Sequence, residues 1–539
     1  TRNGIEYRNY STQQTRIGAH ANLDYDFNRN HKLTWYNGYM DMDEAEVRDG
    51  SDDQDRAIRM KWVHQYIYNS TLRGEHLFLN DGTLKLNWSA VYSKAYSETP
   101  DNAEIFLIGS HVASSGAATR RWEHNSDKDL AGYIDLSYKW KTGSNSVLDF
   151  LAGGMYRDKK RDSFFNEYTF NSATGSGNPQ YIDKNWHNFD EIQFTPRAYG
   201  NISDPLNYDA TEKVGAGYGM VKYTISQWEL IAGVRIEHTD QGYTLKFPTG
   251  NAAPEGNQRY TDILPSFHAK YAIHSNGNLR FSYARAINRP SFFEIVPYSI
   301  INEDYKEKGN PELKHTVADN IDLRYEFFPR SSEQLMVGLF YKNIKDPIEY
   351  GLLNEGQDTY YKPMNFGTAN NWGLEVDILK YFNWLGIKAN YTYTYSKITT
   401  EKRVMQGSEV TTTTQSRPLF GQAAHVANIS FLLKDSKHGW EGQLAMGYTG
   451  KRLSDISNWA DNDIWEKGYT QLDASIEKTL PRGFCLFLKA SNLLNIPVLR
   501  YVHQSERTAN VDSERDNSNL VERKSWHGQS LMIGARFRL

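Results

Sequence analysis

In the segment Asn320-Ile321-Asp322-Leu323-Arg324-Tyr325-Glu326-Phe327, polar and apolar residues alternate without a break. Successive side chains of a β-strand point to opposite faces, so this segment predicts a strand with one apolar face and one polar, charged face. In a water-soluble sandwich, the apolar face would pack against a second sheet. In a membrane β-barrel it would face lipid, and the charged face would line the lumen.

The same alternation recurs along the chain, and this recurrence favours the barrel. The clearest further examples are residues 228–237, 266–273, 387–396, 471–477 and 530–539. About 19 strands can be read, the first at residues 16–27, so the predicted fold class is all-β, a transmembrane antiparallel up-and-down β-barrel. Such barrels normally have an even number of strands. Either this count is wrong or the N-terminal part of the barrel lies outside the chain.

The composition agrees with a barrel and excludes other classes. Only 39% of the 539 residues are hydrophobic and the mean hydropathy is −0.68, whereas aromatic residues reach 14%, which fits aromatic girdles at two membrane interfaces. No run of about 18 apolar residues is present, so no transmembrane helix is expected. The net charge of −4 argues against nucleic acid as a partner. A single cysteine, Cys485, excludes an intramolecular disulfide and any cysteine-based metal cluster.

The expected connections alternate between short turns and long loops. The short links include residues 28–30, 80–82, 275–277, 329–332, 435–438 and 481–483, and the long ones include 159–211, 289–314, 401–416, 455–466 and 503–524. Outer membrane barrels combine short periplasmic turns with long extracellular loops. A soluble sandwich need not separate its connections in this way.

Several motifs resemble those of TonB-dependent outer membrane transporters, in the order and spacing of that family. The resemblance is specific over residues 210–539 and rests on pattern alone before them. The motifs are Leu264-Pro265-Ser266-Phe267, Asn278-Leu279-Arg280-Phe281-Ser282-Tyr283-Ala284-Arg285, Arg289-Pro290, Gly309-Asn310-Pro311-Glu312-Leu313-Lys314, Asn365-Phe366-Gly367-Thr368-Ala369, Gly373-Leu374-Glu375, Arg417-Pro418-Leu419-Phe420-Gly421-Gln422, Leu472-Asp473-Ala474-Ser475, Asn492-Leu493-Leu494-Asn495 and Phe537-Arg538-Leu539.

The resemblance implies a barrel of about 22 strands that is plugged by an N-terminal domain. An inner-membrane complex would act on that plug through a short N-terminal box. Residues 1–539 are then expected to form the barrel domain of a TonB-dependent receptor, with the plug, the box and about three strands outside the chain. No signal peptide opens the sequence, so Thr1 is not expected to begin the precursor.

The leading functional prediction is an active transporter in the outer membrane of a Gram-negative bacterium, importing a scarce or bulky ligand through a plug-gated lumen. The implied partners are membrane lipid and lipopolysaccharide, the protein's own plug, and the TonB complex acting through the missing N-terminus. Two alternatives stay open: a scaffold barrel in a larger surface complex, with a surface lipoprotein as partner, and a passive porin. No catalytic signature is present, so the chain is not expected to be an enzyme. The ligand itself is not readable from the sequence.

Aromatic residues of the long loops are the candidates for ligand contact, because ligand sites combine aromatic surface with a few polar groups. The alternative is that they pack loop against loop or anchor the barrel at the level of lipopolysaccharide. The candidates, including one histidine, are Trp186, His187, Phe189, Phe292, Tyr298, Tyr305, Trp459 and Trp465.

Charged residues on the polar faces of the strands are the candidates for lining the lumen or contacting the plug. The alternative is that a wet lumen simply requires polar side chains, which pair across neighbouring strands. The candidates are Arg235, Arg280, Asp322, Arg324, Glu326, Glu375 and Asp377.

An acidic segment at residues 41–55 suggests calcium, which prefers clustered oxygen ligands. Its spacing does not fit a twelve-residue calcium loop, so a solvated outer loop is expected instead. No His-Glu-x-x-His motif occurs. Neither a metal site nor a cofactor is therefore predicted.

Overall fold

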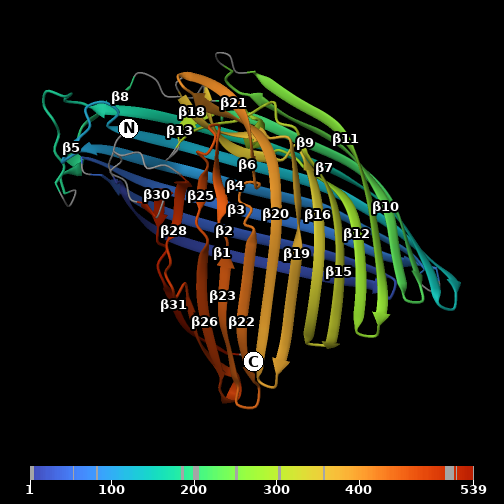
Figure 1. Ribbon diagram of the computed structural model, residues 1–539. Helices are drawn as coiled ribbons and strands as arrows, with labels where there is room; N and C mark the ends of the chain where they lie inside the picture. Colours follow the sequence, from blue (N-terminus) through green and yellow to red (C-terminus); the bar gives the residue numbers. More distant parts are fainter. Residues whose placement is uncertain are drawn as a thin grey trace.

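The computed structural model describes residues 5–52, 54–79, 83–183, 187–197, 205–248, 253–301, 305–355, 358–503, 515–516 and 519–537. Most of these residues belong to long antiparallel strands that curve into one large sheet (Figure 1). The predicted all-β barrel fold is therefore confirmed. The predicted turn at residues 80–82 and the last two residues, Arg538 and Leu539, lie outside the described residues.

The sheet has 22 strands, of which β5 (His111–Val112), β8 (Phe194–Pro196) and β21 (Glu409–Arg417) pair with a single neighbour at the long-loop end. The remaining 19 strands form an up-and-down meander, as the sequence predicted. They are β1 (Tyr7–Asn28), β2 (His31–Ser51), β3 (Asp55–Phe78), β4 (Leu84–Ile108), β6 (Ala118–Gly143), β7 (Ser146–Ser172), β9 (Tyr208–Ile225), β10 (Trp228–Leu245), β11 (Glu255–His274), β12 (Gly277–Asn288), β15 (Thr316–Arg330), β16 (Glu333–Lys345), β19 (Thr368–Phe382), β20 (Leu385–Gln406), β22 (His425–Asp435), β23 (Trp440–Thr449), β26 (Tyr469–Thr479), β27 (Phe484–Ser491) and β31 (Ser530–Phe537).

The two faces of the sheet differ as the alternation predicted. In β15, the apolar side chains of Ile321 and Leu323 are 40% and 42% exposed, whereas Glu326 on the opposite face is only 7% exposed. We call these the apolar face and the polar face of the sheet. Large hydrophobic side chains left exposed along a whole sheet are costly in water and favourable in lipid. The apolar face is therefore the lipid-facing surface of the barrel.

The two outer strands of the meander differ from the rest. In the part of the chain that the structure describes, β1 pairs only with β2, and β31 pairs only with β27. Almost every side chain of β1 is exposed, on both faces. A sheet edge without a partner is not tolerated in lipid. The expectation that further strands complete the barrel stays a prediction.

The long loops are themselves folded, and they form a second sheet of nine strands at the long-loop end. We call this sheet, together with the short helix α1 (Phe292–Ile295), the cap. Its strands, in spatial order, are β13 (Ser299–Ile301), β14 (Lys306–Lys308), β18 (Asp358–Asn365), β17 (Ile348–Glu355), β24 (Arg452–Ser457), β25 (Ile464–Glu466), β28 (Val498–His503), β30 (Asn519–Ser525) and β29 (Arg515–Asp516).

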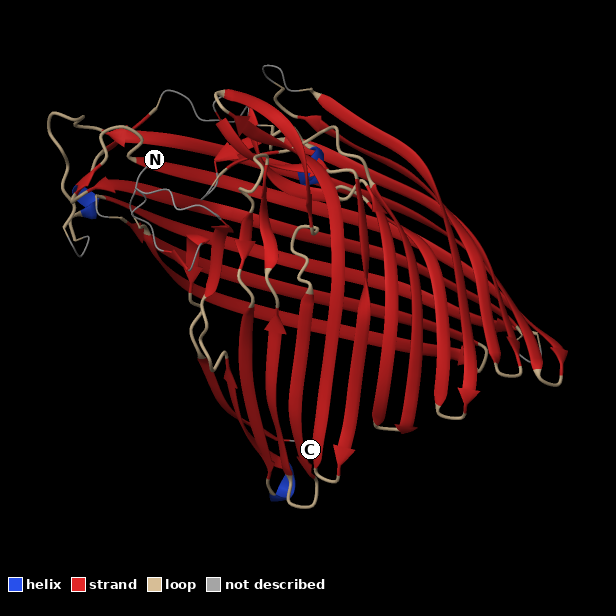
Figure 2. Cartoon of the chain, in the orientation of Figure 1, coloured by secondary structure: helices blue, strands red, loops and turns tan. Residues whose placement is uncertain are grey.

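Helix is scarce among the described residues (Figure 2). Besides α1, they include two 3-10 turns, η1 (Phe189–Glu191) and η2 (Pro481–Gly483). Within the described ranges, no helix is long and apolar enough to cross a membrane.

Three expectations about loops are wrong. Residues 159–172, expected as the start of the loop 159–211, belong to β7. Residues 401–416, expected as a loop, extend β20 and return as β21, with Met405 opposite Val410. The run of threonines there favours a strand because β-branched side chains fit a pleated surface. The described residues from 41 to 51, expected as part of a solvated loop, belong to β2. Some of their charges are paired: Glu46 forms an ion pair with Arg59 at 2.7 Å.

Candidate ligand site beneath the cap

A cavity of about 330 Å³ lies between the polar face of β3, β4, β6 and β7 and the cap. The wall side is polar and includes Arg59, Lys61 and Arg121. The cap side includes Phe293 and Glu307. A hollow that combines an apolar cover with a few charged groups is the usual form of a ligand site.

The segment that carries α1 is held against the wall by its own local structure. Ser291 Oγ accepts a hydrogen bond from Glu294 N at 3.3 Å, and Glu294 Oε2 accepts one from Ser291 N at 2.7 Å, which makes a capping box. Two cations of β7 lie over the ring of Phe292: Lys159 Nζ at 5.2 Å and Arg161 Cζ at 5.5 Å from its centroid. The cap is therefore docked on the polar face of the barrel wall.

Tyr298 closes the core of the cap beside the cavity. Its side chain is fully buried, and its hydroxyl donates to Glu307 Oε1 at 3.1 Å. Burial raises the pKa of Tyr298, and the neighbouring carboxylate of Glu307 adds to that effect. The hydroxyl therefore stays protonated and keeps Glu307 in place at the cavity.

The three cations of the cavity wall are not equivalent. Arg59 is paired with Glu46 at 2.7 Å, and Arg121 is paired with Glu167 at 2.8 Å. Lys61 is half-buried and has no ion pair with any residue that the structure describes. Lys61 is thus the cation of this wall that can form an ion pair with an oxygen atom of a ligand.

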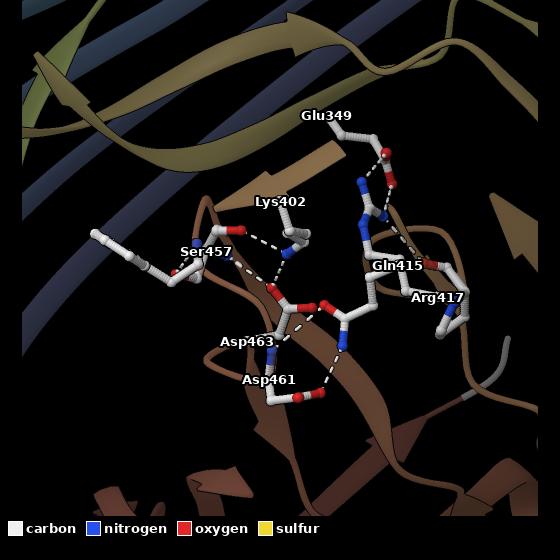
Figure 3. Close-up of polar contacts among 9 residues, drawn as sticks. Glu349, Lys402, Gln415, Arg417, Ser457, Asp461 and Asp463 are labelled. Atoms are coloured by element: carbon white, nitrogen blue, oxygen red, sulfur yellow. Dashed lines mark hydrogen bonds and ion pairs between the residues drawn. The ribbon is translucent and has the colours of Figure 1, made fainter. Parts of the chain in front are cut away.

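The cap is braced by two buried ion pairs (Figure 3). Arg417 binds both carboxylate oxygens of Glu349, at 3.1 and 2.9 Å. Lys402 donates to Asp463 Oδ1 at 2.5 Å, and burial lowers the pKa of this lysine. These pairs join β20 and β21 to β17 and to the segment after β24. They keep the cap compact, since a buried carboxylate requires its partner.

The predicted aromatic contacts are spread over the long-loop end. Trp186 lies outside the described residues. His187 and Phe189 are exposed on the segment around η1, away from the residues that line the cavity. Phe292 and Tyr298 are buried in the core of the cap.

The other predicted aromatic residues lie in strands of the cap sheet or next to them. Tyr305 stacks on Tyr361 with ring centroids 6.2 Å apart. Trp465 lies in β25 beneath Lys451 Nζ at 5.5 Å, and Trp459 is half-buried just after β24. None of these three lines the cavity.

The predicted charged residues make polar contacts with one another or with neighbouring side chains. They lie on strands other than β3, β4, β6 and β7, which line the cavity. Each makes a contact on the polar face, although Arg235 contacts a residue of its own strand and Asp322 and Asp377 contact neutral side chains. That they line the lumen or contact a plug stays a prediction. The contacts are Arg235 Nε to Glu237 at 2.6 Å, Arg280 Nε to Glu326 at 2.7 Å, Arg324 Nη2 to Glu375 at 3.5 Å, Gln334 Nε2 to Asp377 at 2.5 Å and Ser282 Oγ to Asp322 at 3.4 Å.

Lys61 was missed by the sequence-based reasoning. The alternation Arg59-Met60-Lys61-Trp62 places it on the polar face, but nothing in the sequence distinguishes it from a paired lysine. Its lack of a partner depends on Glu46, the residue opposite it, turning to Arg59 instead.

The fold and its lipid-facing surface define an outer membrane β-barrel. A model of the outer membrane protein beta-barrel family matches residues 76–523, and the chain belongs to this family. The family and the fold together confirm two predictions from the sequence: that the chain is an outer membrane β-barrel and that it lies in the outer membrane. The family is one of barrel proteins, which confirms the prediction that the chain is not an enzyme. Among curated proteins, no relative matches the sequence.

Solved structures of receptors and transporters share the fold. The siderophore receptor PiuA from Acinetobacter baumannii is 14% identical with a TM-score of 0.62, over 99% of this chain and 81% of that one. The ferric citrate transporter FecA is 12% identical with a TM-score of 0.60, over 99% and 78%. The copper transporter OprC is 12% identical with a TM-score of 0.59, over 99% and 80%.

Proposed function

We propose that the protein is an outer membrane transporter whose ligand binds in the cavity beneath the cap and then passes along the polar face of the sheet. Lys61 carries this proposal. A half-buried cation without a partner is unfavourable, so an anionic oxygen of a ligand stabilises it on binding. Solved structures of the same fold include a siderophore receptor, a ferric citrate transporter and a copper transporter. We extend their transport role, but not their ligands, to this chain.

The proposal includes parts outside residues 1–539. A plug domain gates the lumen, and the TonB complex supplies energy through an N-terminal box. The paired charges of the polar face, such as Arg324 and Glu375, then face the plug or the passing solute. The sequence of the gene upstream of Thr1 tests this part. A gene that encodes no plug-like domain there contradicts energised transport and favours the porin.

The transport role is tested by growth of a deletion strain on single limiting nutrients. We expect one nutrient to stop supporting growth, and the wild-type gene to restore it. Lys61→Gln removes the free cation, so uptake at low concentration of that nutrient should require about tenfold more of it. Lys437→Gln is the matched control, because Lys437 is exposed in the short turn between β22 and β23.

Two results would contradict the proposal. Unchanged growth of the deletion strain on every nutrient, with surface lipoproteins copurifying in equal amount, would favour the scaffold. Equal losses of uptake in Lys61→Gln and Lys437→Gln would show that the cavity is not the ligand site.

A further inference from the structure

One imidazole and two carboxylates meet across β2 and β3, on the side of the wall that faces away from the lumen. Asp41 and Asp43 are two residues apart in β2, so their side chains lie on one face, and His64 of β3 is directly opposite Asp43. His64 Nδ1 is 3.0 Å from Asp43 Oδ1, and His64 Nε2 is 3.8 Å from Asp41 Oδ2. One potential ligand atom of each residue lies within 4.8 Å of the other two. We call these three residues the outer triad.

The outer triad lies on the apolar face but beyond the lipid. Trp62 of β3 points to the same face as His64 and is 52% exposed, whereas Lys61 lines the cavity on the polar face. From Phe78, at the short-turn end of β3, ten residues at about 3.3 Å each and a tilt of about 40° cover the lipid band of about 25 Å and end at Tyr68. His64 is four residues further along the strand. An ion from the surrounding water therefore reaches the outer triad without entering the lumen.

A neutral imidazole cannot serve both carboxylates of the outer triad. It has one N–H and one lone pair, so His64 donates to one carboxylate while its lone pair faces an oxygen atom of the other. The two carboxylates also repel each other. A metal ion that is bound by this lone pair and by both carboxylates replaces these unfavourable contacts with three favourable ones. The alternative is a second proton on His64, which would leave no ligand for a metal.

The surrounding protein adds negative charge to the outer triad and does not neutralise it. Glu98 of β4 is directly opposite His64, on the other side from β2. Among the described residues, no lysine or arginine forms an ion pair with any of these three carboxylates. On the polar face, by contrast, the carboxylate of Asp127 has Arg161 Nε at 2.6 Å. A divalent cation supplies the positive charge that the protein does not.

The ligand set favours a transition metal over calcium. Calcium takes about six to eight oxygen ligands, whereas an imidazole nitrogen suits zinc and its neighbours in the first row. Ligand atoms on one tetrahedral zinc ion are about 3.3 Å apart, a spacing that the outer triad reaches by small side-chain rotations. The Tyr39 hydroxyl donates to Asp41 Oδ2 at 2.8 Å and holds this carboxylate in place. The side chains of Asp41, His64 and Asp43 are 18%, 32% and 44% exposed, so a fourth position is open to water.

We propose that the outer triad binds a divalent transition-metal ion of the zinc type. Asp41, Asp43 and His64 are the ligands, and Tyr39 is a positioning residue. The ion links β2 to β3 in the folded chain, so it stabilises this end of the wall, next to the outermost strand β1. The site faces away from the lumen. The proposal is therefore independent of the transport role, and the nutrient experiments do not test it.

Calorimetric titration of the untagged, detergent-solubilised full chain with zinc chloride tests the proposal. His64→Gln should bind this zinc ion about a hundredfold more weakly than the wild type, since loss of a group that only supports a ligand already costs about 10–100-fold. Asp43→Asn should have a similar effect. It serves in place of His64→Gln if that variant does not show the heat-dependent shift in gel migration that is typical of folded barrels.

His238→Gln is the matched control. His238 is an exposed histidine on the same apolar face, its Nδ1 is 2.9 Å from Thr261 Oγ1, and the residues opposite it are Thr261 and Gly215, neither of which is a carboxylate. This variant should bind zinc as the wild type does. Zinc should also raise the temperature at which the folded barrel loses its fast gel migration in the wild type and the control, but not in His64→Gln.

Two further measurements separate the outer triad from a general attraction of carboxylates for cations. Tyr39→Phe should weaken zinc binding severalfold without changing the number of ions bound. Calcium chloride should bind the wild type much more weakly than zinc chloride does. The proposal is overturned if His64→Gln binds zinc as tightly as the wild type. It is also overturned if calcium binds the wild type as tightly as zinc, because oxygen atoms alone would then form the site.

Discussion

The cap and the barrel wall use the same kind of ion pair in opposite surroundings. In the cap, the side chains of Arg417 and Glu349 are 2% and 4% exposed and 2.9 Å apart. On the wall, those of Arg324 and Glu375 are 45% and 48% exposed and 3.5 Å apart. Water screens the wall pair, whereas the cap pair has lost its hydration and depends on its partner. Burial, and not the number of ion pairs, therefore decides where charge controls stability.

The largest effect is expected from Arg417→Met. This change leaves Glu349 buried with the Phe420 backbone N–H, at 2.6 Å, as its remaining donor among the contacts described here. We expect the free energy of unfolding of the cap to fall by about 3–5 kcal/mol, measured by hydrogen exchange of the backbone amides of β17 and β21. The double variant Arg417→Met, Glu349→Leu should recover most of the loss. Exchange as slow as in the wild type would show that the pair does not brace the cap.

A smaller loss, about 2–3 kcal/mol, is expected from Lys402→Met. Asp463 is also buried and, like Glu349, keeps one backbone donor, the Ser457 N–H at 2.8 Å. It loses one hydrogen bond from Lys402, whereas Glu349 loses two from Arg417. Hydrogen exchange of the segment from β24 to β25 measures the change. A loss larger than that of Arg417→Met would contradict this ranking by the number of hydrogen bonds lost.

One wall pair should lie between the two environments. Glu326 is 7% exposed although its partner Arg280, at 2.7 Å, is half exposed. Arg280→Met should therefore lower stability by about 1–2 kcal/mol. The temperature at which the folded barrel loses its fast gel migration measures this. No change would mean that Glu326 is hydrated from the lumen.

The smallest effect is expected from Arg324→Gln, within about 0.5 kcal/mol of the wild type. Its pair with Glu375 is exposed and long, so the same gel measurement should show no shift. A loss as large as that of Arg280→Met would mean that the polar face is much drier than the exposure of its side chains indicates.

The barrel wall was predictable because its signal is local. The alternation at residues 320–327 identifies a strand without knowledge of its neighbours, and the count of 19 strands follows from repeating that test. The cap was not predictable in this way. Glu349 and Arg417 are 68 residues apart, and no period in the sequence connects them.

The candidate site was only partly predictable for a related reason. Loop aromatics were chosen as ligand contacts, yet Phe292 and Tyr298 are buried in the core of the cap. An apolar side chain in a folded loop packs against other loops before it meets a ligand. No sequence pattern distinguishes Lys61 from other lysines of the polar face. What distinguishes it is the absence of an ion pair among the described residues, which is visible only in the folded structure.

The order of strands in the cap sheet has a consequence for surface variation. Strands from separate loops are neighbours there: β14 pairs with β18, β17 with β24, and β25 with β28. Exchanging one of these loops between homologues removes a strand from the middle of the sheet, so these loops must diversify together. The tip of the β20–β21 hairpin is different. Gly407 has a φ of 66° with open space around it, and an epitope inserted there would lengthen the tip of the hairpin beyond the contacts that Lys402 and Arg417 make with the cap.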